Sequence, residues 1–287
     1  MNLFCPVNQY SMRNVFSQEY ENINLKPLSG ALGAEIVGID FNKISKDELA
    51  EVQHAYINYH LIVIRNQVLS PDDFVAIGNR MGDLVRLPSS FSASDYLDIL
   101  EVENNDNKDP YYPFNQWSSD LSFLRTPASA SIAYCIDCEG FGGESVFASQ
   151  SLAYASLSQT TQSILDNLKA VHSFNADNPG DNYPLTTSRG YNIHPVIRTL
   201  DDTGLKAIFV NPMFTRKIFG MKEAESNMLL NFLYDHVTQE AFTCRLIWEK
   251  NTLAIWDNRC LQHFNLFSRK SGLRKILKSL MLGNKPY

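Results

Sequence analysis

Two short segments, far apart in the chain, contain residues that could together bind a metal ion. Residues 117–123 read Trp-Ser-Ser-Asp-Leu-Ser-Phe and include Asp120, and residues 256–263 read Trp-Asp-Asn-Arg-Cys-Leu-Gln-His and end at His263. A mononuclear iron site without haem combines two histidines and one carboxylate, and it leaves the remaining coordination positions open for reactants. The carboxylate typically comes from a His-x-Asp motif at a strand end, and the second histidine from a strand much farther along the chain. Asp120 and His263 could supply a carboxylate and an imidazole to such a site, although this spacing is by itself a loose signature.

Four segments resemble those of the taurine dioxygenase (TauD/TfdA) family of iron(II)- and 2-oxoglutarate-dependent dioxygenases. They occur in the family's order and comprise residues 142–145, 194–199, 209–214 and 254–263. The last is similar to the family's distal-histidine segment almost residue for residue, and the resemblance extends from residue 25 to residue 286. It implies a mixed α+β fold with a double-stranded β-helix core, a jelly roll of the cupin type, surrounded by helices. It also implies an oxidoreductase that oxidises a small organic or amino acid while decarboxylating 2-oxoglutarate.

The resemblance implies the metal ligands position by position. Asp120 stands at the family's carboxylate ligand and His263 at its distal imidazole ligand, whereas Ser118 stands where the first histidine belongs. A serine hydroxyl is a poorer neutral ligand for iron(II) than imidazole. We therefore expect an atypical metal site in which iron(II) binds weakly or not at all, with no catalytic residue beyond the metal site.

The resemblance also implies residues that bind the co-substrate and the substrate. Ser145 falls at the hydroxyl that hydrogen-bonds 2-oxoglutarate, and Arg274, eleven residues after His263, falls at the guanidinium that clamps its far carboxylate. Arginine suits this role because its planar fork binds a carboxylate through two parallel hydrogen bonds. Lys278 occupies the position of an arginine that grips the substrate's sulfonate in the taurine enzyme. A lysine attracts an anion as a point charge, so we expect an anionic substrate whose head group need not be that of taurine.

Aromatic side chains near these positions are candidates for the wall of the substrate pocket. They are Phe214, Trp117 and Phe114, of which Phe214 is the strongest candidate. Small-molecule pockets are lined mainly by apolar and aromatic residues, although aromatic residues in barrels also serve as plain core.

The incomplete ligand set leaves two other functions open. One is an enzyme of the same fold that works without redox iron, by elimination or isomerisation with Asp120 or His263 as the acid or base. The other is a catalytically inactive homologue that still binds a carboxylate ligand through Arg274 and Ser145. Retention of all four of these residues favours a site that is in use. An engineered histidine-to-serine change at Ser118 is also consistent with the sequence.

Composition and charge indicate a globular protein that binds small molecules. The 287 residues are 44% hydrophobic and 20% charged, with a formal net charge of -6. We expect no nucleic-acid partner, because phosphate binding requires a concentrated basic surface. No apolar stretch approaches the roughly 20 residues that span a bilayer, and the five cysteines at irregular spacing do not form a disulfide framework. The sequence therefore predicts a cytoplasmic protein without a membrane partner, and the resemblance suggests a homo-oligomer.

One domain positions all the candidate site residues. We expect an N-terminal tail over residues 1–22 and a single TauD-like dioxygenase domain over residues 23–287, because nothing marks a boundary within it. Short apolar runs predict strands at residues 61–64, 99–102, 131–136, 145–148, 207–210, 242–248, 252–256 and 276–282. Capping residues and apolar periodicity predict helices that begin at Ser45, Ser70, Ser158 and about Lys222. The third helix is expected to bury Ile164, Leu165 and Leu168, and the fourth, which runs to Val237, to bury Leu229, Phe232 and Leu233.

Overall fold

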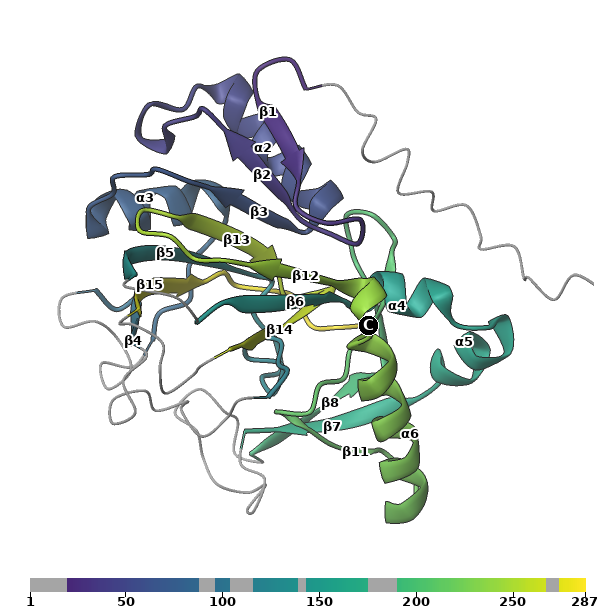
Figure 1. The fold of residues 1–287 in the computed structure, drawn as a ribbon. Coiled ribbons are helices and arrows are strands. Elements are labelled where there is room, and N and C mark those ends of the chain that lie inside the picture. Colours follow the sequence, from purple (N-terminus) through teal and green to yellow (C-terminus); the bar gives the residue numbers. More distant parts are fainter. Residues whose placement is uncertain (1–19, 88–95, 104–115, 139–142, 175–189, 267–273) are drawn as a thin grey trace, which may run out of the picture.

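Two facing β-sheets form the centre of the fold, and helices lie outside them (Figure 1). The structure is a computed structural model that describes residues 20–87, 96–103, 116–138, 143–174, 190–266 and 274–287. The larger sheet contains, in spatial order, β1 (Asn24–Pro27), β2 (Ala34–Val37), β3 (Leu61–Ile64), β13 (Leu253–Asp257), β5 (Ala130–Cys138), β15 (Arg274–Leu280) and β4 (Leu100–Glu103). The smaller sheet contains β12 (Thr243–Leu246), β6 (Ser145–Ser149) and β14 (Leu261–Asn265). Within both sheets every pair is antiparallel except β2 with β3, which is the arrangement expected of a jelly roll.

Alternation along the central strands explains why the larger sheet is covered on both faces. On β5, Ile132 and Tyr134 belong to a core cluster shared with α2 (Lys46–Tyr59) and α3 (Pro71–Met81). The intervening Ala133 and Cys135 belong to a second cluster, which includes Phe147 of β6 in the smaller sheet. Successive side chains of a strand point to opposite faces, so a strand between two apolar layers is apolar throughout. The cavity described below opens beside the second of these layers, between the sheets.

Both N-terminal helices begin at the residues that the sequence predicts. Ser45 accepts a hydrogen bond from the backbone N–H of Glu48, and Ser70 accepts one from that of Asp73, in each case with the reciprocal bond of a capping box. Each bond satisfies a backbone donor that has no partner inside the helix. At the chain's described start, the backbone N–H groups of residues 21–23 donate to the carboxylate of Glu51 on α2. The predicted tail over residues 1–22 otherwise lies outside the described residues.

A second group of short strands and helices lies outside the two central sheets (Figure 1). It contains β7 (Lys169–Ser173), β8 (Tyr191–Pro195) and β11 (Thr215–Ile218) in one sheet, β9 (Ile197–Thr199) and β10 (Lys206–Ile208) in another, and α4 (Gln150–Ser156), α5 (Gln159–Leu165) and α6 (Glu223–Val237). Two single-turn 3-10 helices, Phe41–Lys43 and Glu240–Phe242, complete the described elements. The predicted burial of Leu165 on α5 and Leu233 on α6 is confirmed, since both are fully buried. The predicted burial of Ile164 and Phe232 on the same helices is wrong, because these residues are 57% and 47% exposed.

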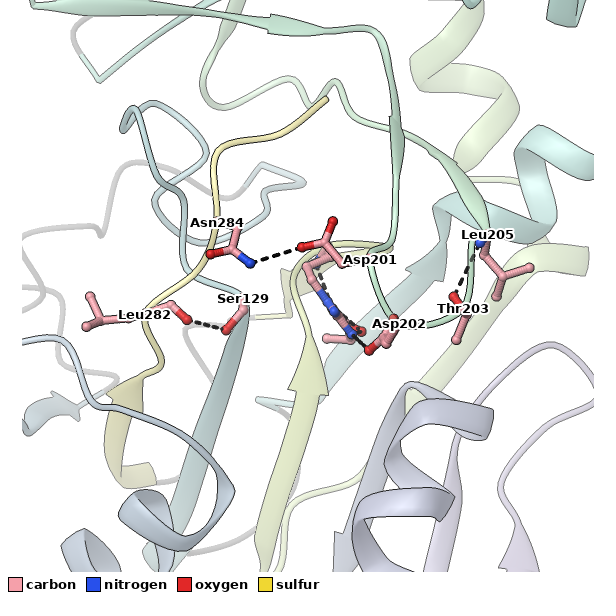
Figure 2. A network of polar contacts seen from close by, with 9 residues as sticks. Ser129, Asp201, Asp202, Thr203, Leu205, Leu282 and Asn284 are labelled. Atoms are coloured by element: carbon pink, nitrogen blue, oxygen red, sulfur yellow. Dashed lines mark hydrogen bonds and ion pairs between the residues drawn. The ribbon is translucent and has the colours of Figure 1, made fainter.

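Polar contacts fix the segment that follows β15, the strand that carries Arg274 and Lys278. Figure 2 shows Asn284 pointing at Asp201, and its amide donates to the carboxylate at 3.0 Å. The hydroxyl of Ser129 donates to the carbonyl of Leu282 at 2.7 Å, as the same view shows. The Ser129 contact holds the residues after β15 against the start of β5, and the Asn284 contact holds them against the turn between β9 and β10. The pairing of β15 with β5 places the site residues of β15 themselves.

Candidate active site

A cavity of about 130 Å³ lies between the two sheets and contains most of the predicted site residues. The larger sheet contributes residues from β4, β5, β13 and β15, and the smaller sheet contributes residues from β6 and β14. The predicted residues that line it are Ser118, Asp120, Ser145, Phe214, His263, Arg274 and Lys278. Residues separated by up to 160 positions in the sequence therefore converge on one cavity, as a shared binding site requires.

Ser118 and His263 lie directly opposite each other in an isolated antiparallel bridge. The Ser118 N–H donates to the His263 carbonyl at 3.0 Å, and the His263 N–H donates to the Ser118 carbonyl at 2.8 Å. This reciprocal pair joins the segment that carries Asp120 to β14. The bridge explains how a carboxylate and an imidazole so far apart in sequence line the same wall.

Asp120 is engaged by two side chains. The Lys278 ammonium lies 2.8 Å from Oδ1 and 2.7 Å from Oδ2, and the Ser131 hydroxyl donates to Oδ2 at 2.6 Å. The amide of Asn258 donates in turn to the Ser131 hydroxyl at 2.8 Å, which orients that hydroxyl toward the carboxylate. Burial alone would raise the pKa of Asp120, but the Lys278 ammonium, His263 and the hydrogen bonds outweigh burial and lower the pKa. Asp120 is therefore held as a carboxylate.

The imidazole of His263 lies in an aromatic surround. Its ring centroid is 5.4 Å from that of Trp256 and 6.0 Å from that of Phe147. Its Nδ1 is buried and has no hydrogen-bond partner among the described residues. Burial lowers the pKa of His263 to about 4, against the opposing effect of the Asp120 carboxylate, so the ring is neutral at physiological pH. A neutral imidazole is the form that binds a metal ion.

The donor set fits iron(II) with two protein ligands. A carboxylate and a neutral imidazole at the wall of one cavity match two of the three ligands of an iron oxygenase site. Ser118 offers only a hydroxyl at the third position, and the Lys278 ammonium already contacts both oxygens of Asp120. The residues that would hold the ion are therefore Asp120 and His263, and its remaining positions would belong to water or to ligands from solution.

Ser145 and Arg274 lie at the same end of the cavity, where the co-substrate is expected. The Ser145 hydroxyl donates to the side-chain oxygen of Asn265 at 2.6 Å and accepts from the indole N–H of Trp248 at 2.9 Å. The Arg274 guanidinium lies over the Trp248 ring and donates to the carbonyl of Gly143. Gly143 adopts a φ of +74°, which glycine reaches without steric cost, and this conformation brings its carbonyl to the arginine. Trp248 and Asn265 thus hold the two predicted co-substrate residues in place.

An apolar wall faces these polar groups. Phe214 lines the cavity and packs against Phe123, with ring centroids 4.9 Å apart. Other apolar lining residues include Leu100, Leu121, Met213 and Leu280. Trp117 is not among the described residues that line the cavity, because its ring packs against Phe264 at 5.7 Å. Phe114 lies outside the described residues.

Comparison with known proteins identifies the family. The family model described as taurine catabolism dioxygenase TauD, TfdA family matches residues 24–275. The chain belongs to the TauD/TfdA family. It is similar to an alpha-ketoglutarate-dependent sulfate ester dioxygenase of Pseudomonas putida, with 27% identity over 92% of this chain and 91% of that protein. It is also similar to an alpha-ketoglutarate-dependent sulfonate dioxygenase of Saccharomyces cerevisiae, with 29% identity over 87% of this chain and 64% of that protein.

A solved structure confirms the predicted fold of this TauD/TfdA chain. A taurine dioxygenase from Burkholderia xenovorans superimposes with a TM-score of 0.80 and 26% identity, covering 93% of this chain and 91% of that one. The predicted jelly-roll core is therefore confirmed. The predicted class, an oxidoreductase that uses iron(II) and 2-oxoglutarate, is confirmed by the family and its relatives. None of the helices in the described part of the chain combines the length and hydropathy that a membrane span requires.

Hydrogen bonds from β8 hold the segment that follows Asp120. Asn192 and His194 of β8 contact the carbonyls of Phe123 and Leu124, both at 2.8 Å. Burial lowers the pKa of His194 to about 4, so a neutral ring donates this hydrogen bond. His194 falls in one of the segments that carry the resemblance, and its hydrogen bond supports the segment that follows Asp120.

Sequence reasoning missed several polar residues around the site. Asn265 could have been found, because it lies two residues after His263 on one strand and therefore points to the same face. Ser131 and Asn258 had no such signal, since their contacts depend on the pairing of β5 with β13. The structure assigns these residues a supporting role for the groups that the sequence did predict.

A second group of potential metal ligands lies outside the cavity, where the end of α2 meets the turn between β13 and β14. Ligand atoms of His60, Asp257 and Cys260 lie within 4.8 Å of one another. The Arg259 guanidinium contacts both oxygens of Asp257, at 2.7 to 3.2 Å. Burial raises the pKa of the Cys260 thiol well above its usual value. A protonated thiol and a carboxylate paired with arginine are poor metal ligands, so we assign no metal to this group. The ion pair between Arg259 and Asp257 instead stabilises the turn.

Proposed function

We propose that this chain is a 2-oxoglutarate-dependent oxygenase of a small organic sulfonate or sulfate ester, with an iron site of two protein ligands. One observation carries the proposal: Asp120, His263, Arg274 and Ser145 converge on a single cavity from four separate segments. The relatives named above act on sulfate esters and sulfonates, which supports the substrate class. The predicted homo-oligomer and the absence of a nucleic-acid partner remain predictions.

The charges around the cavity favour an anionic substrate with an apolar body. Arg274 and Lys278 bring two positive charges, and Asp120 is the one acid among the described lining residues. A substrate ammonium such as that of taurine would therefore find only a carboxylate that is already paired with Lys278. The apolar wall at Phe214 instead matches an alkyl or aryl group. Burial of such a group stabilises the complex by about 25 cal/mol per Å².

The chain's own residues would bind and orient the reactants. Arg274 would grip the far carboxylate of 2-oxoglutarate as a bidentate clamp, and the Ser145 hydroxyl would contribute a hydrogen bond. Lys278 would attract the sulfonate or sulfate head group, while Phe214 holds the carbon chain. When bound, iron(II) would supply the activation of dioxygen with oxidation of 2-oxoglutarate that is characteristic of the family. The protein's contribution is to hold a C–H bond of the substrate close to the metal position.

An anaerobic titration tests the metal and co-substrate sites together. Iron(II) and 2-oxoglutarate are added to the protein while the visible charge-transfer band of the chelate is recorded, in parallel with a Ser118→His variant. We expect a weak band in the native protein and a stronger one in the variant, because a third ligand raises iron affinity. A band in neither protein would contradict the assignment of Asp120 and His263 as metal ligands.

Turnover tests the reaction itself. We expect succinate formation from 2-oxoglutarate when hexyl sulfate or hexanesulfonate is supplied with iron(II) and air, and less with taurine. Arg274→Met should abolish it, whereas the matched control Arg245→Met, an exposed arginine on β12, should not change it. Charge-transfer binding without succinate formation from any of these substrates would instead indicate an inactive ligand-binding homologue.

A further inference from the structure

The Lys278 ammonium contacts both oxygens of the carboxylate that a metal ion would need. Its Nζ bridges both carboxylate oxygens at 2.7 to 2.8 Å, and both side chains are shielded from solvent, with exposed fractions of 15% and 16%. The face of the Trp256 ring lies 5.1 Å from Nζ and stabilises the ammonium in this position. A largely buried carboxylate requires a counter-charge, and here a lysine of the same chain provides it.

An iron ion at Asp120 would meet this lysine directly. Each carboxylate oxygen accepts at two positions, and Oδ2 already accepts from both Lys278 and Ser131. A metal ion would therefore bind at Oδ1, which is itself in contact with the Lys278 ammonium. An ion bound beside Lys278 would also experience repulsion between like charges in a partly desolvated site. The serine at position 118 offers no imidazole that would compensate for this cost.

An anion in the cavity would relieve the competition. Lys278 lines the cavity, and its long, flexible side chain can turn its ammonium from Asp120 to a sulfonate or sulfate group. The carboxylate would then be available to the metal. The same movement would bring the anion's charge close to the metal site and remove the repulsion.

We infer that Lys278 and the metal ion compete for Asp120, so that an anionic substrate promotes metal binding by drawing Lys278 away. Lys278 thereby acts as a positioning residue that couples the two binding events, and this coupling is reciprocal. The inference rests on the proposed function for the identity of the metal ligands and of the anion.

Binding of manganese(II), a redox-stable substitute for iron(II), tests this coupling without any turnover. The solution EPR signal of free manganese(II) reports its Kd for the native protein and for Lys278→Met, which keeps the side chain's length but removes its charge. We expect Lys278→Met to bind manganese(II) at least about tenfold more tightly than the native protein without an anion, given the strength of close charge interactions. Lys275→Met is the matched control, since Lys275 is the same residue type on the same strand but pairs with Glu101 outside the cavity.

Addition of hexanesulfonate provides the second arm of the test. Hexanesulfonate should lower the Kd for manganese(II) of the native protein and of Lys275→Met. It should leave the Kd of Lys278→Met unchanged. Equal or weaker manganese(II) binding by Lys278→Met, or the same effect of hexanesulfonate on all three proteins, would overturn the inference. If native affinity is too low to measure, the comparison is made in the Ser118→His background, and absence of binding there also overturns it.

The outcome is separable from that of the proposed function. Coupling between hexanesulfonate and manganese(II) without succinate formation would leave the inference standing and remove the oxygenase proposal. Succinate formation without coupling would leave the oxygenase proposal standing and overturn the inference about Lys278.

Discussion

Replacing Ser131 by alanine is expected to destabilise the fold by removing two buried hydrogen bonds, one to Asp120 and one from Asn258. The Ser131 hydroxyl donates to the carboxylate at 2.6 Å and accepts from the amide of Asn258 at 2.8 Å, and its side chain has an exposed fraction of 0%. A hydrogen bond to a charged group contributes about 1.5–3 kcal/mol, and the loss of the second bond adds to this, so the expected decrease in the free energy of unfolding is about 2–4 kcal/mol.

Equilibrium unfolding in urea measures this decrease, with Ser279→Ala as the control. Ser279 is equally buried on the neighbouring strand β15, but its hydroxyl makes one neutral hydrogen bond, to the carbonyl of Asp98 at 2.6 Å. Its replacement should cost about 1 kcal/mol. In a double-mutant cycle with Asp120→Asn, the Ser131 effect should shrink, because the charged acceptor is gone. If Ser131→Ala costs no more than Ser279→Ala, or if the cycle shows no coupling, the polar network does not stabilise Asp120 as argued.

Three further substitutions test other parts of the structure. Gly283→Ala should destabilise the protein by about 2–4 kcal/mol, because an added Cβ would overlap the backbone carbonyl oxygen of Pro127, while Gly30→Ala, with open space around it, should be neutral in the same urea assay. Arg259→Lys should lower the melting temperature with a loss of about 2 kcal/mol, since a lysine cannot reproduce the bidentate pair with a fully buried carboxylate; an unchanged melting temperature would contradict this role. Burial lowers the pKa of His194 to about 4, whereas the same histidine in the unfolded chain titrates near pH 6.5. Between these two pH values the unfolded chain binds a proton that the native protein does not bind. The free energy of unfolding should therefore fall by about 3 kcal/mol as the pH falls from 6.5 to 4. His194→Gln should remove that part of the pH dependence of unfolding, and an unaltered dependence would refute the assignment.

The helices and central strands were predictable because their signals are local. The capping boxes at Ser45 and Ser70 and the apolar runs of β3, β5 and β13 depend only on neighbouring residues, and the structure has elements at these places. The burial of Ile164 and Phe232 was predicted wrongly, because an apolar residue at helical spacing does not reveal which side of a short helix meets the core. The strands β7, β8 and β11 were missed, since each is short and mixes polar with apolar residues.

The candidate site was predictable as a set of residues but not as a set of contacts. Its members could be named from motifs, and most of them line one cavity. The ion pair between Lys278 and Asp120 depends on the register in which β15 lies beside β5, with Lys278 opposite Ala133. Sequence periodicity places Lys278 on a face of its strand, but it does not determine which carboxylate lies across the sandwich. The sequence shows the serine at position 118, but the pairing of Lys278 with Asp120 became visible only with the tertiary structure.

The same contacts weigh against an elimination or isomerisation by acid–base catalysis without iron. A general base works best when its pKa lies near the operating pH and its lone pairs can reach the substrate. The pKa of Asp120 is lowered despite its burial, chiefly by the Lys278 ammonium, and its oxygens are engaged by Lys278 and Ser131. Burial lowers the pKa of His263 to about 4, which makes it a weak base at physiological pH. Both residues have the charge states of metal ligands, an ionised carboxylate and a neutral imidazole, so the geometry favours a metal-dependent reaction once Lys278 has been drawn away.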